Sequence, residues 1–514
     1  MNTLPVATKH AALKVLLEKA LALVGLALIV FGAKMLFIRY FGSTLPYWDQ
    51  WDAEADSLYK AYLNSSLSWS ALFAAHNEHR IFLTRVLSLA LFELDGGWDP
   101  ILQMMVNAAL HVVAILLIVF ALQRILRPAQ LIALIVFTAV LFVLPIGWEN
   151  LLAGFQSQFY LLLIFSIVAL SGFAVAAAFS VRWWLSVACT AAAFFSMASG
   201  ALIGAAALAI VAVQLLLRVR HGSKEYAGAA ILFGMSTVMI AYVPHIVGHD
   251  GLKAHNIREL STALLACLQY PRAGSWIALL TNLPLVAYAY FVVAARPART
   301  SPHWVILSVV VWWFGQILSL SYGRAVAPNS SRYLDITIVA MPVNFAILLF
   351  FATLVRLTGK QWVVLLVTVG WLAMTFGGLM LDMVRTTYPN VIKKAAQSRE
   401  QEANVAAYLR TGDITALQNK SMLAIPYPSA DRLASLLSDP TIRMALPRTI
   451  RPEDMDEKAL LERMVLRGRS HAALERTKLA IMNLAPVVLA LGMALALGAG
   501  FSLRPAPLKD EGAD

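Results

Sequence analysis

Long apolar segments recur along nearly the whole chain and are separated by short polar connections. Hydrophobic residues make up 60% and charged residues 14% of the 514 positions, whereas a soluble domain carries about 25% charged residues. About twelve of the apolar segments are long enough to cross a bilayer whose hydrocarbon core is about 30 Å thick. The sequence therefore predicts an all-α, polytopic membrane protein with about twelve transmembrane helices.

The expected spans depend on how one long apolar stretch divides. Residues 183–218 suit two short spans with a turn near Ser199 and Gly200. With that division, every short loop on one side of the bilayer carries Lys or Arg, as cytoplasmic loops do. Both termini are then expected in the cytoplasm. The expected spans are 16–38, 99–123, 130–146, 151–178, two within 183–218, 227–247, 274–295, 303–320, 335–357, 361–381 and 479–502.

Three polar segments are expected together on the opposite face: 39–98, 322–335 and 385–478. Within the first of them, residues 81–94 are apolar but too short to cross a bilayer, so we expect a helix that lies at the interface. The chain then divides into a transmembrane catalytic module, a small helical region and a last transmembrane helix with a tail, over residues 1–384, 385–478 and 479–514 respectively.

Acidic residues are concentrated just after the first span. If Pro46 occupies the first position of a helix, Asp49, Asp52 and Asp56 lie on one face of it. We interpret this row of carboxylates as the centre of an active site. The alternative is an ordinary solvated helix face, with Asp49 favouring the helix N-terminus.

Aromatic and polar neighbours of these acids are candidates for substrate binding. Indole rings suit stacking on a sugar ring, although aromatic residues are common at membrane interfaces without any catalytic role. The candidate substrate-binding residues are Trp48, Trp51, Glu54, His76, Glu78, His79 and Arg80. Asp49, Asp52 and Glu78 are also possible ligands for a hard divalent cation, Mg²⁺ or Mn²⁺. Their spacing matches no strong metal motif, so the sequence predicts no certain cofactor.

A second polar cluster lies between two long apolar spans and contains Arg324, Arg332 and Tyr333. A charge in such a place is costly unless it has a partner. The fork of an arginine donates two parallel hydrogen bonds to a phosphate, and the hydroxyl of Tyr333 adds a third donor. We predict that these residues bind the phosphate of a lipid-linked donor. Anchoring of the span ends at the lipid headgroups is the alternative.

Carboxylates and phosphate-binding arginines on one face suggest transfer of a sugar from a lipid phosphate. A sugar hydroxyl is a poor nucleophile, so a carboxylate within hydrogen-bond reach acts as general base. The leaving phosphate gains negative charge, which fixed arginine donors stabilise. Asp49 and Asp52 are the candidate catalytic residues. Asp49 is preferred because it is the first acid after the span.

The order of these features resembles the GT-C superfamily of integral-membrane glycosyltransferases, which includes protein mannosyltransferases and the lipid A aminoarabinose transferase. The resemblance is carried by the first span, the acids of YWDQWD, the interfacial helix and a second span that ends at Arg124 and Arg127. It departs from the usual adjacent Asp-Glu pair, since Gln50 follows Asp49. The resemblance implies a GT-C fold in the bacterial inner membrane, with a polyprenyl-phosphate sugar as donor and an active site that faces the periplasm.

The expected partners are a polyprenyl-phosphate sugar, a glycan, lipid or protein acceptor, and membrane lipid. The net charge of +12 lies largely in short loops and indicates no nucleic acid. Two other functions remain open. A transporter or flippase of lipid-linked saccharide would place paired charges within the membrane. An O-antigen ligase or polymerase would leave the early acidic loop unexplained.

Overall fold

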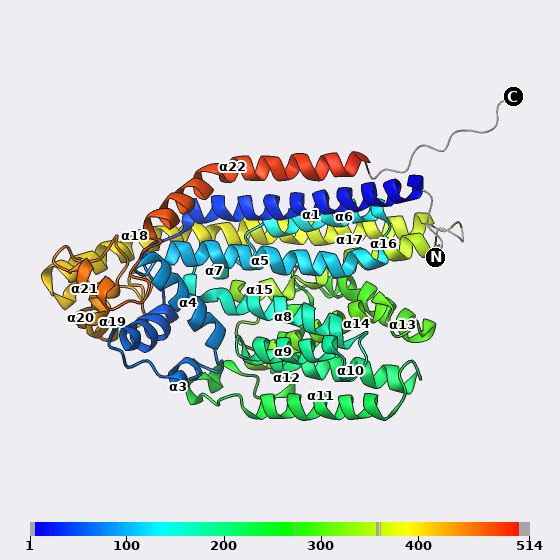
Figure 1. Ribbon diagram of the computed structural model, residues 1–514, viewed down its shortest axis with the longest axis horizontal. Helices are drawn as coiled ribbons and strands as arrows, with labels where there is room; N and C mark the ends of the chain where they lie inside the picture. The colour runs from blue at the N-terminus through cyan, green and yellow to red at the C-terminus, as the bar shows by residue number, and fades with distance from the viewer. Residues whose placement is uncertain (1–5, 273, 356–358, 360, 503–514) are drawn as a thin grey trace.

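The structure is a computed structural model that describes residues 6–272, 274–355, 359 and 361–502. These residues form helices and loops, and the β-structure among them is an isolated bridge between His76 and His79. Long helices lie side by side in a bundle, and shorter helices form a head at one end of it (Figure 1). The predicted class, a helical polytopic membrane protein, is confirmed at that level.

The bundle contains most of the apolar sequence. Its helices are α1 (Val6–Phe41), α5 (Pro100–Leu122), α6 (Pro128–Val143), α8 (Ser157–Phe173), α9 (Val181–Phe194), α10 (Ala201–Leu216), α11 (Ser223–Ala241), α12 (Ile257–Leu268), α13 (Leu283–Ala295), α14 (Pro302–Gly323), α16 (Ala340–Val355), α17 (Gln361–Asp382) and α22 (His471–Ser502).

Eight helical segments of the described residues are long and apolar enough to cross a membrane, and three shorter apolar helices accompany them. The stretch 183–218 does divide into two helices, α9 and α10, with a short 3-10 turn over Ala198–Gly200 between them. The helix that contains the expected span 361–381 does not end in a loop. It continues through a π-helical turn, Met383–Thr387, into α18 (Tyr388–Thr411). The count of twelve spans stays a prediction.

The first and last helices pack unusually closely. A Cβ atom added at Gly492 of α22 would lie 2.6 Å from the backbone nitrogen of Ile29 in α1, and one added at Gly25 would lie 2.8 Å from the nitrogen of Ala496. Only glycine allows this approach, which is the usual way that apolar helices associate in lipid. α22 is therefore held to the bundle mainly through α1.

The head is built from two segments that are far apart in the sequence. The first loop supplies a π-helix (Trp51–Lys60), α2 (Ala61–Leu63), α3 (Trp69–Leu72) and α4 (Phe82–Asp95). The region after α18 supplies α19 (Ala430–Ser438), α20 (Pro440–Ala445) and α21 (Glu457–Glu462). Trp51 and Tyr59 share one hydrophobic cluster with Leu433 and Leu437. The first loop and the region 385–478 thus fold around a common core.

The opposite end of the bundle carries basic connections. Arg220 and Arg299 both pair with Glu225, at 2.8 Å and 3.3 Å, so two of the loops that were expected on one side of a membrane meet there. The starts of α1 and α11 and the end of α22 also lie at this end, away from the head (Figure 1). The three polar segments lie at the other end, in and beside the head.

Candidate active site

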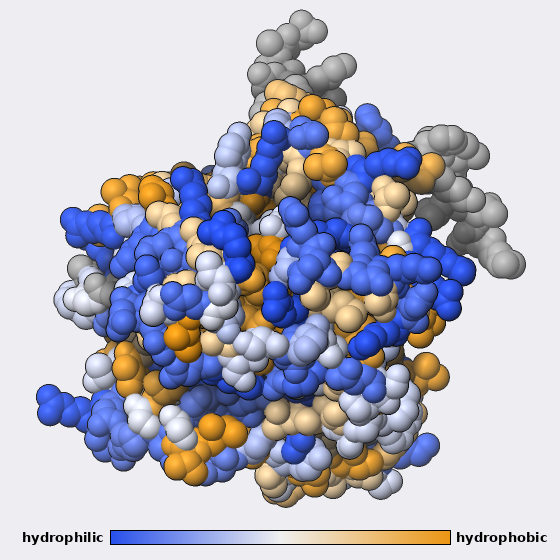
Figure 2. Space-filling model, turned by 90° about the vertical axis from the view of Figure 1, so that its left-hand side faces the viewer, coloured by the Kyte–Doolittle hydropathy of each residue, from blue (hydrophilic) through white to orange (hydrophobic). Residues whose placement is uncertain are grey.

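A pocket opens where the bundle meets the head, and several elements contribute to it. Tyr47, Trp48 and Asp49 follow α1, two short helices supply further walls, and α18 closes one side. The short helices are α7 (Trp148–Leu151) and α15 (Ser331–Thr337). The polar lining consists mainly of Trp48, Asp49, Glu149, Arg332 and Lys394. Figure 2 looks onto the head end and shows a mostly hydrophilic surface with hydrophobic side chains near its centre.

Asp49 is the carboxylate of the first loop that reaches this pocket. Its side chain is 45% exposed, and Nε2 of His76 lies 3.9 Å from Oδ2. Burial raises the pKa of Asp49, but the His76 imidazole and the charge of Arg332 outweigh it, so the pKa lies below its ordinary value. Asp49 is therefore a carboxylate at neutral pH, which is the form that a general base requires.

The backbone beside Asp49 is strained. Trp48 has a φ of 51°, a left-handed conformation that is rare for a bulky residue and costs about 1–3 kcal/mol. Its amide donates to the carbonyl of Pro426, at 2.8 Å, which ties this turn to the head. The buried indole nitrogen of Trp48 makes no hydrogen bond with the described residues. The turn thus brings Trp48 and Asp49 together into the lining of one pocket.

Arg332 lies across the pocket from Asp49, at the start of α15. One of its guanidinium nitrogens is 3.6 Å from the carboxylate of Glu149, a loose ion pair. The other oxygen of Glu149 accepts hydrogen bonds from the Arg332 amide and from the hydroxyls of Ser330 and Ser331. One oxygen of Glu149 therefore binds the Arg332 amide and the two serine hydroxyls, and the guanidinium of Arg332 is only loosely paired.

Lys394 supplies a second positive charge to the pocket. It is 8% exposed, its nitrogen lies 3.9 Å from the centre of the Tyr47 ring, and it donates to the hydroxyl of Ser398 at 2.9 Å. A buried lysine whose donors are only partly used can bind an anion that enters the pocket.

Arg324 does not face the pocket as an open phosphate site. It forms a bidentate pair with Glu78, at 3.1 and 2.9 Å, and also donates to the hydroxyl of Tyr333 at 3.1 Å. The ring of His249 adds a 2.7 Å contact to Glu78. Of the residues predicted to bind phosphate, Arg332 alone lines the pocket, whereas Arg324 and Tyr333 lie in this ion-pair network.

The predicted row of three carboxylates is wrong. Asp52 and Asp56 both accept from Arg432, at 2.9 and 2.7 Å, and the hydroxyl of Tyr427 donates to Asp52 at 2.6 Å. Helical geometry begins only at Asp49, after the turn at Trp48, and not at Pro46. The wider turn of the π-helix then directs Asp52 and Asp56 to the head and leaves Asp49 on the pocket side.

Glu54 and Trp51 are buried in the head, so neither is positioned to touch a substrate. Glu54 is 1% exposed and accepts hydrogen bonds from Gln50, Ser88, Trp98 and Gln103. Burial raises the pKa of this carboxyl above its ordinary value, although the four donors oppose the shift. Trp51 is fully buried, and its indole donates to the Pro46 carbonyl. Both residues thus make hydrogen bonds within the protein instead.

His79 and Arg80 connect the first loop to neighbouring helices. The Nδ1 atom of His79 accepts from the amide of Ala198 at 3.4 Å, and burial lowers the pKa of His79 to about 4. The guanidinium of Arg80 lies 4.0 Å from the centre of the Tyr242 ring and donates to the carbonyl of Phe73. Neither residue lines the pocket.

The structure does not bring Asp49, Asp52 and Glu78 together as metal ligands, because each faces a different positively charged or imidazole partner. Among the described residues, the acids and histidines with metal-like spacing are Asp95, His471 and Glu475. Arg448 already bonds to Asp95 and to the ring of His471, and Lys478 pairs with Glu475. These three residues thus already have cationic partners within the protein.

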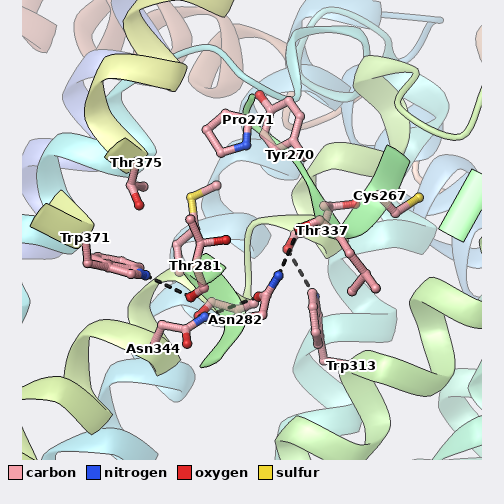
Figure 3. Close-up of a pocket in the computed structure, with 13 residues that line it drawn as sticks. Cys267, Tyr270, Pro271, Thr281, Asn282, Trp313, Thr337, Asn344, Trp371 and Thr375 are labelled. Carbon is pink, nitrogen blue, oxygen red and sulfur yellow. Dashed lines mark hydrogen bonds between the residues drawn. The ribbon is translucent and has the colours of Figure 1, made fainter. Parts of the chain in front are cut away.

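Another pocket lies inside the bundle, between α12 and α17, and Figure 3 shows its lining. The indole nitrogens of Trp313 and Trp371 point to the backbone carbonyls of Thr337 and Thr281, at 3.0 and 2.8 Å. Asn282 donates to the carbonyl of Leu268 at 2.9 Å. Asn344 and Thr375 each keep a buried side-chain oxygen without a partner among the described residues. The described lining of this pocket contains no charged residue, so it is the weaker candidate.

Comparisons with protein-family models, curated proteins and solved structures found no match. Glu149 and Lys394 were not predicted as site residues. The signal for Glu149 was its place beside Trp148 where an apolar segment ends, and Lys394 carried no local signal.

The Glu78–Arg324 pair yields a test of stability. Burial raises the pKa of Glu78, but the hydrogen bonds from Arg324 and His249 lower it to about 2. Its stabilising contribution is therefore present above about pH 4.5 and lost as the pH falls towards 2. We expect Glu78→Gln to lower the free energy of unfolding by about 3 kcal/mol at pH 7, because Arg324 keeps a charge without its partner.

The measurement is thermal unfolding in detergent, with Glu462→Gln as control. Glu462 is 63% exposed and only pairs with Lys458 at 3.9 Å, so its loss should cost little. Equal unfolding temperatures for the two variants at pH 7 would contradict a stabilising role for the Glu78 pair.

Proposed function

We propose that the protein is an integral-membrane glycosyltransferase of the GT-C type, which transfers a sugar from a polyprenyl-phosphate donor to an acceptor in the cell envelope. One observation carries the proposal: a carboxylate, Asp49, and a guanidinium, Arg332, line one pocket at the end of an apolar bundle. A lipid donor needs apolar helices for its chain, cations for its phosphate and a base for the acceptor.

The proposed reaction uses the two sides of the pocket differently. The acceptor hydroxyl attacks the anomeric carbon, and its proton passes to the Asp49 carboxylate. The bond between that carbon and the phosphate oxygen breaks, and its electron pair stays on the polyprenyl phosphate. Arg332 and Lys394 stabilise the added charge, because donors already held in position do not have to reorganise as the charge develops. Tyr47, Trp48, Trp148 and Phe155 form the aromatic part of the lining, which suits a sugar ring.

Purified protein in lipid nanodiscs tests this function. A panel of polyprenyl-phosphate hexoses and pentoses is added with a glycan, lipid or peptide acceptor, and the release of polyprenyl phosphate is followed. At least one donor should bind and be consumed. A protein that binds none of the panel and consumes none would not be such an enzyme. The sugar and the acceptor are identified by the same screen.

A transporter or flippase of lipid-linked saccharide is the second candidate, and a buried cluster favours it. Lys34, His111 and Asp335 are 7%, 2% and 3% exposed, and Nε2 of His111 is 3.9 Å from Asp335. Neither ring nitrogen of His111 makes a hydrogen bond with the described residues. Charged groups inside a membrane bundle commonly mark ion or substrate pathways. Movement of an intact labelled lipid across proteoliposomes, without bond cleavage, distinguishes this function from transfer.

The proposed placement is a bacterial inner membrane crossed by about twelve spans, with both termini cytoplasmic and the head in the periplasm. We predict that a periplasmic phosphatase reporter is active after Pro46, Asn329 or Ala430 and inactive after Arg127 or Arg299. The physical reason is the excess of Lys and Arg in loops at the end opposite the head. Reporter activity after Arg299 would overturn the assignment of 183–218 as two spans.

A further inference from the structure

A groove lies on the side of the bundle, far from the candidate active site. The residues that line it come from the last turns of α5 and α8 and from the start of α9. Arg124 follows Pro100 by 24 positions along a nearly continuous helix, so the groove lies about 36 Å from the head end of α5. No part of the proposed reaction uses it.

Two arginines stand at this groove without an acidic partner. The guanidinium of Arg124 lies 4.9 Å from the centre of the Phe120 ring, and Arg182 donates to the carbonyl of Ser171 at 2.9 Å. Both arginines line the same groove. The described residues place no carboxylate within ion-pair distance of either one. An anion from outside the protein would complete this charge arrangement.

The rest of the groove is apolar. Leu117 and Ile167 form its floor, and Phe120 and Leu185 are 48% and 56% exposed at its rim. These side chains belong to helices that are apolar enough to lie in a membrane. The groove is therefore apolar along the helices and carries two guanidiniums at one end. This arrangement matches one lipid molecule, with its hydrocarbon chain along the helices and its phosphate at the arginines.

We propose that this groove binds an anionic phospholipid, with its phosphodiester at Arg124 and Arg182 and an acyl chain along α5, α8 and α9. Paired arginines can hold phosphate oxygens through several charge-assisted hydrogen bonds. Basic pockets between helices at the cytoplasmic surface are typical sites for anionic headgroups. The inference rests on the charge and shape of the groove and on membrane insertion, and it does not depend on sugar transfer.

The test measures lipid binding and needs no turnover. The full protein, in a zwitterionic detergent, is titrated with phosphatidylglycerol or phosphatidylcholine while bound lipid is counted by native mass spectrometry. Phosphatidylglycerol should bind to the wild type and should bind at least about tenfold more weakly to Arg124→Gln/Arg182→Gln, a loss of about 1.4 kcal/mol. Arg127→Gln removes the same charge from an exposed residue outside the groove and should bind like the wild type.

Three outcomes would overturn the proposal. Phosphatidylcholine that binds as tightly as phosphatidylglycerol would show that headgroup charge is not recognised. Unchanged affinity in the double variant would leave the arginines with a role in membrane orientation alone. Inorganic phosphate that competes fully for the site at matched concentration would identify a phosphate site and not a lipid site. Should the double variant fail to fold, either single variant carries the same test, since each removes one guanidinium.

Discussion

Replacement of Asp49 by asparagine is expected to lower single-turnover sugar transfer by about 100-fold or more, with the protein folded and its donor bound. Asparagine keeps the shape of the side chain but cannot accept the proton of the acceptor hydroxyl. Asp49 is the carboxylate of the first loop that lines the pocket, and burial raises its pKa while the His76 imidazole and the charge of Arg332 bring it below the ordinary value. The measurement is product formation by purified protein at saturating donor.

Asp52→Asn is the matched control, because it makes the same chemical change three residues away. Asp52 is held by Arg432 and Tyr427, so its replacement should loosen the contact between the first loop and the region 385–478 and leave the chemical step largely intact. We therefore expect a lower unfolding temperature for Asp52→Asn and slow transfer for Asp49→Asn. A reversal of these two results would exchange the roles of the residues, and normal transfer by both would remove the main support for an enzyme.

The helical fold could largely be predicted from the sequence, because hydropathy and loop charge are local properties. The apolar stretch 183–218 contains Ser199 and Gly200 where the chain turns between α9 and α10. The continuation of α17 into α18 could not be predicted in the same way. The residues after 387 are mostly polar, so their sequence does not indicate that a membrane helix continues through them. Packing against the head stabilises this continuation.

The site could be predicted only in part, because its partners come from distant positions. The acids after α1 indicated the loop that contributes Asp49 to the pocket, yet Arg432, which holds Asp52, lies 380 positions away. A sequence pattern cannot show that such a partner removes an acid from the pocket. The same holds for Arg324, whose pairing with Glu78 spans 246 positions. The sequence identified charged residues that need partners, and long-range folding decided which of them remain available.

Lys394 shows the opposite case, a site residue without a local signal. It follows another lysine in a polar helix, and nothing in that stretch distinguishes it from a solvated residue. Packing of α18 against Tyr47 buries it beside the pocket, where a cation is costly unless an anion compensates it. The charge of Glu402, on the same helix, compensates part of that cost, and an incoming phosphate would compensate more.

The different pairing of Arg332 and Arg324 leads to the prediction with the second large effect. Arg332→Ala is expected to weaken binding of the polyprenyl-phosphate donor by about 2–5 kcal/mol, since it removes a charge-assisted contact from a partly buried pocket. Arg332 is bound loosely to Glu149, at 3.6 Å, and a phosphate can displace that contact. The measurement is the dissociation constant for the donor, taken in nanodiscs by equilibrium binding.

Arg324→Ala supplies the control for Arg332→Ala, because it removes the same group from a residue that is already paired. Arg324 is committed to Glu78 and Tyr333, so its loss should lower thermal stability and leave donor affinity nearly unchanged. Lys394→Met should weaken donor binding less than Arg332→Ala, because a lysine makes single rather than forked hydrogen bonds. Unaltered donor affinity in both Arg332→Ala and Lys394→Met would exclude this pocket as the phosphate site, and loss confined to Arg324→Ala would place the phosphate beside Glu78.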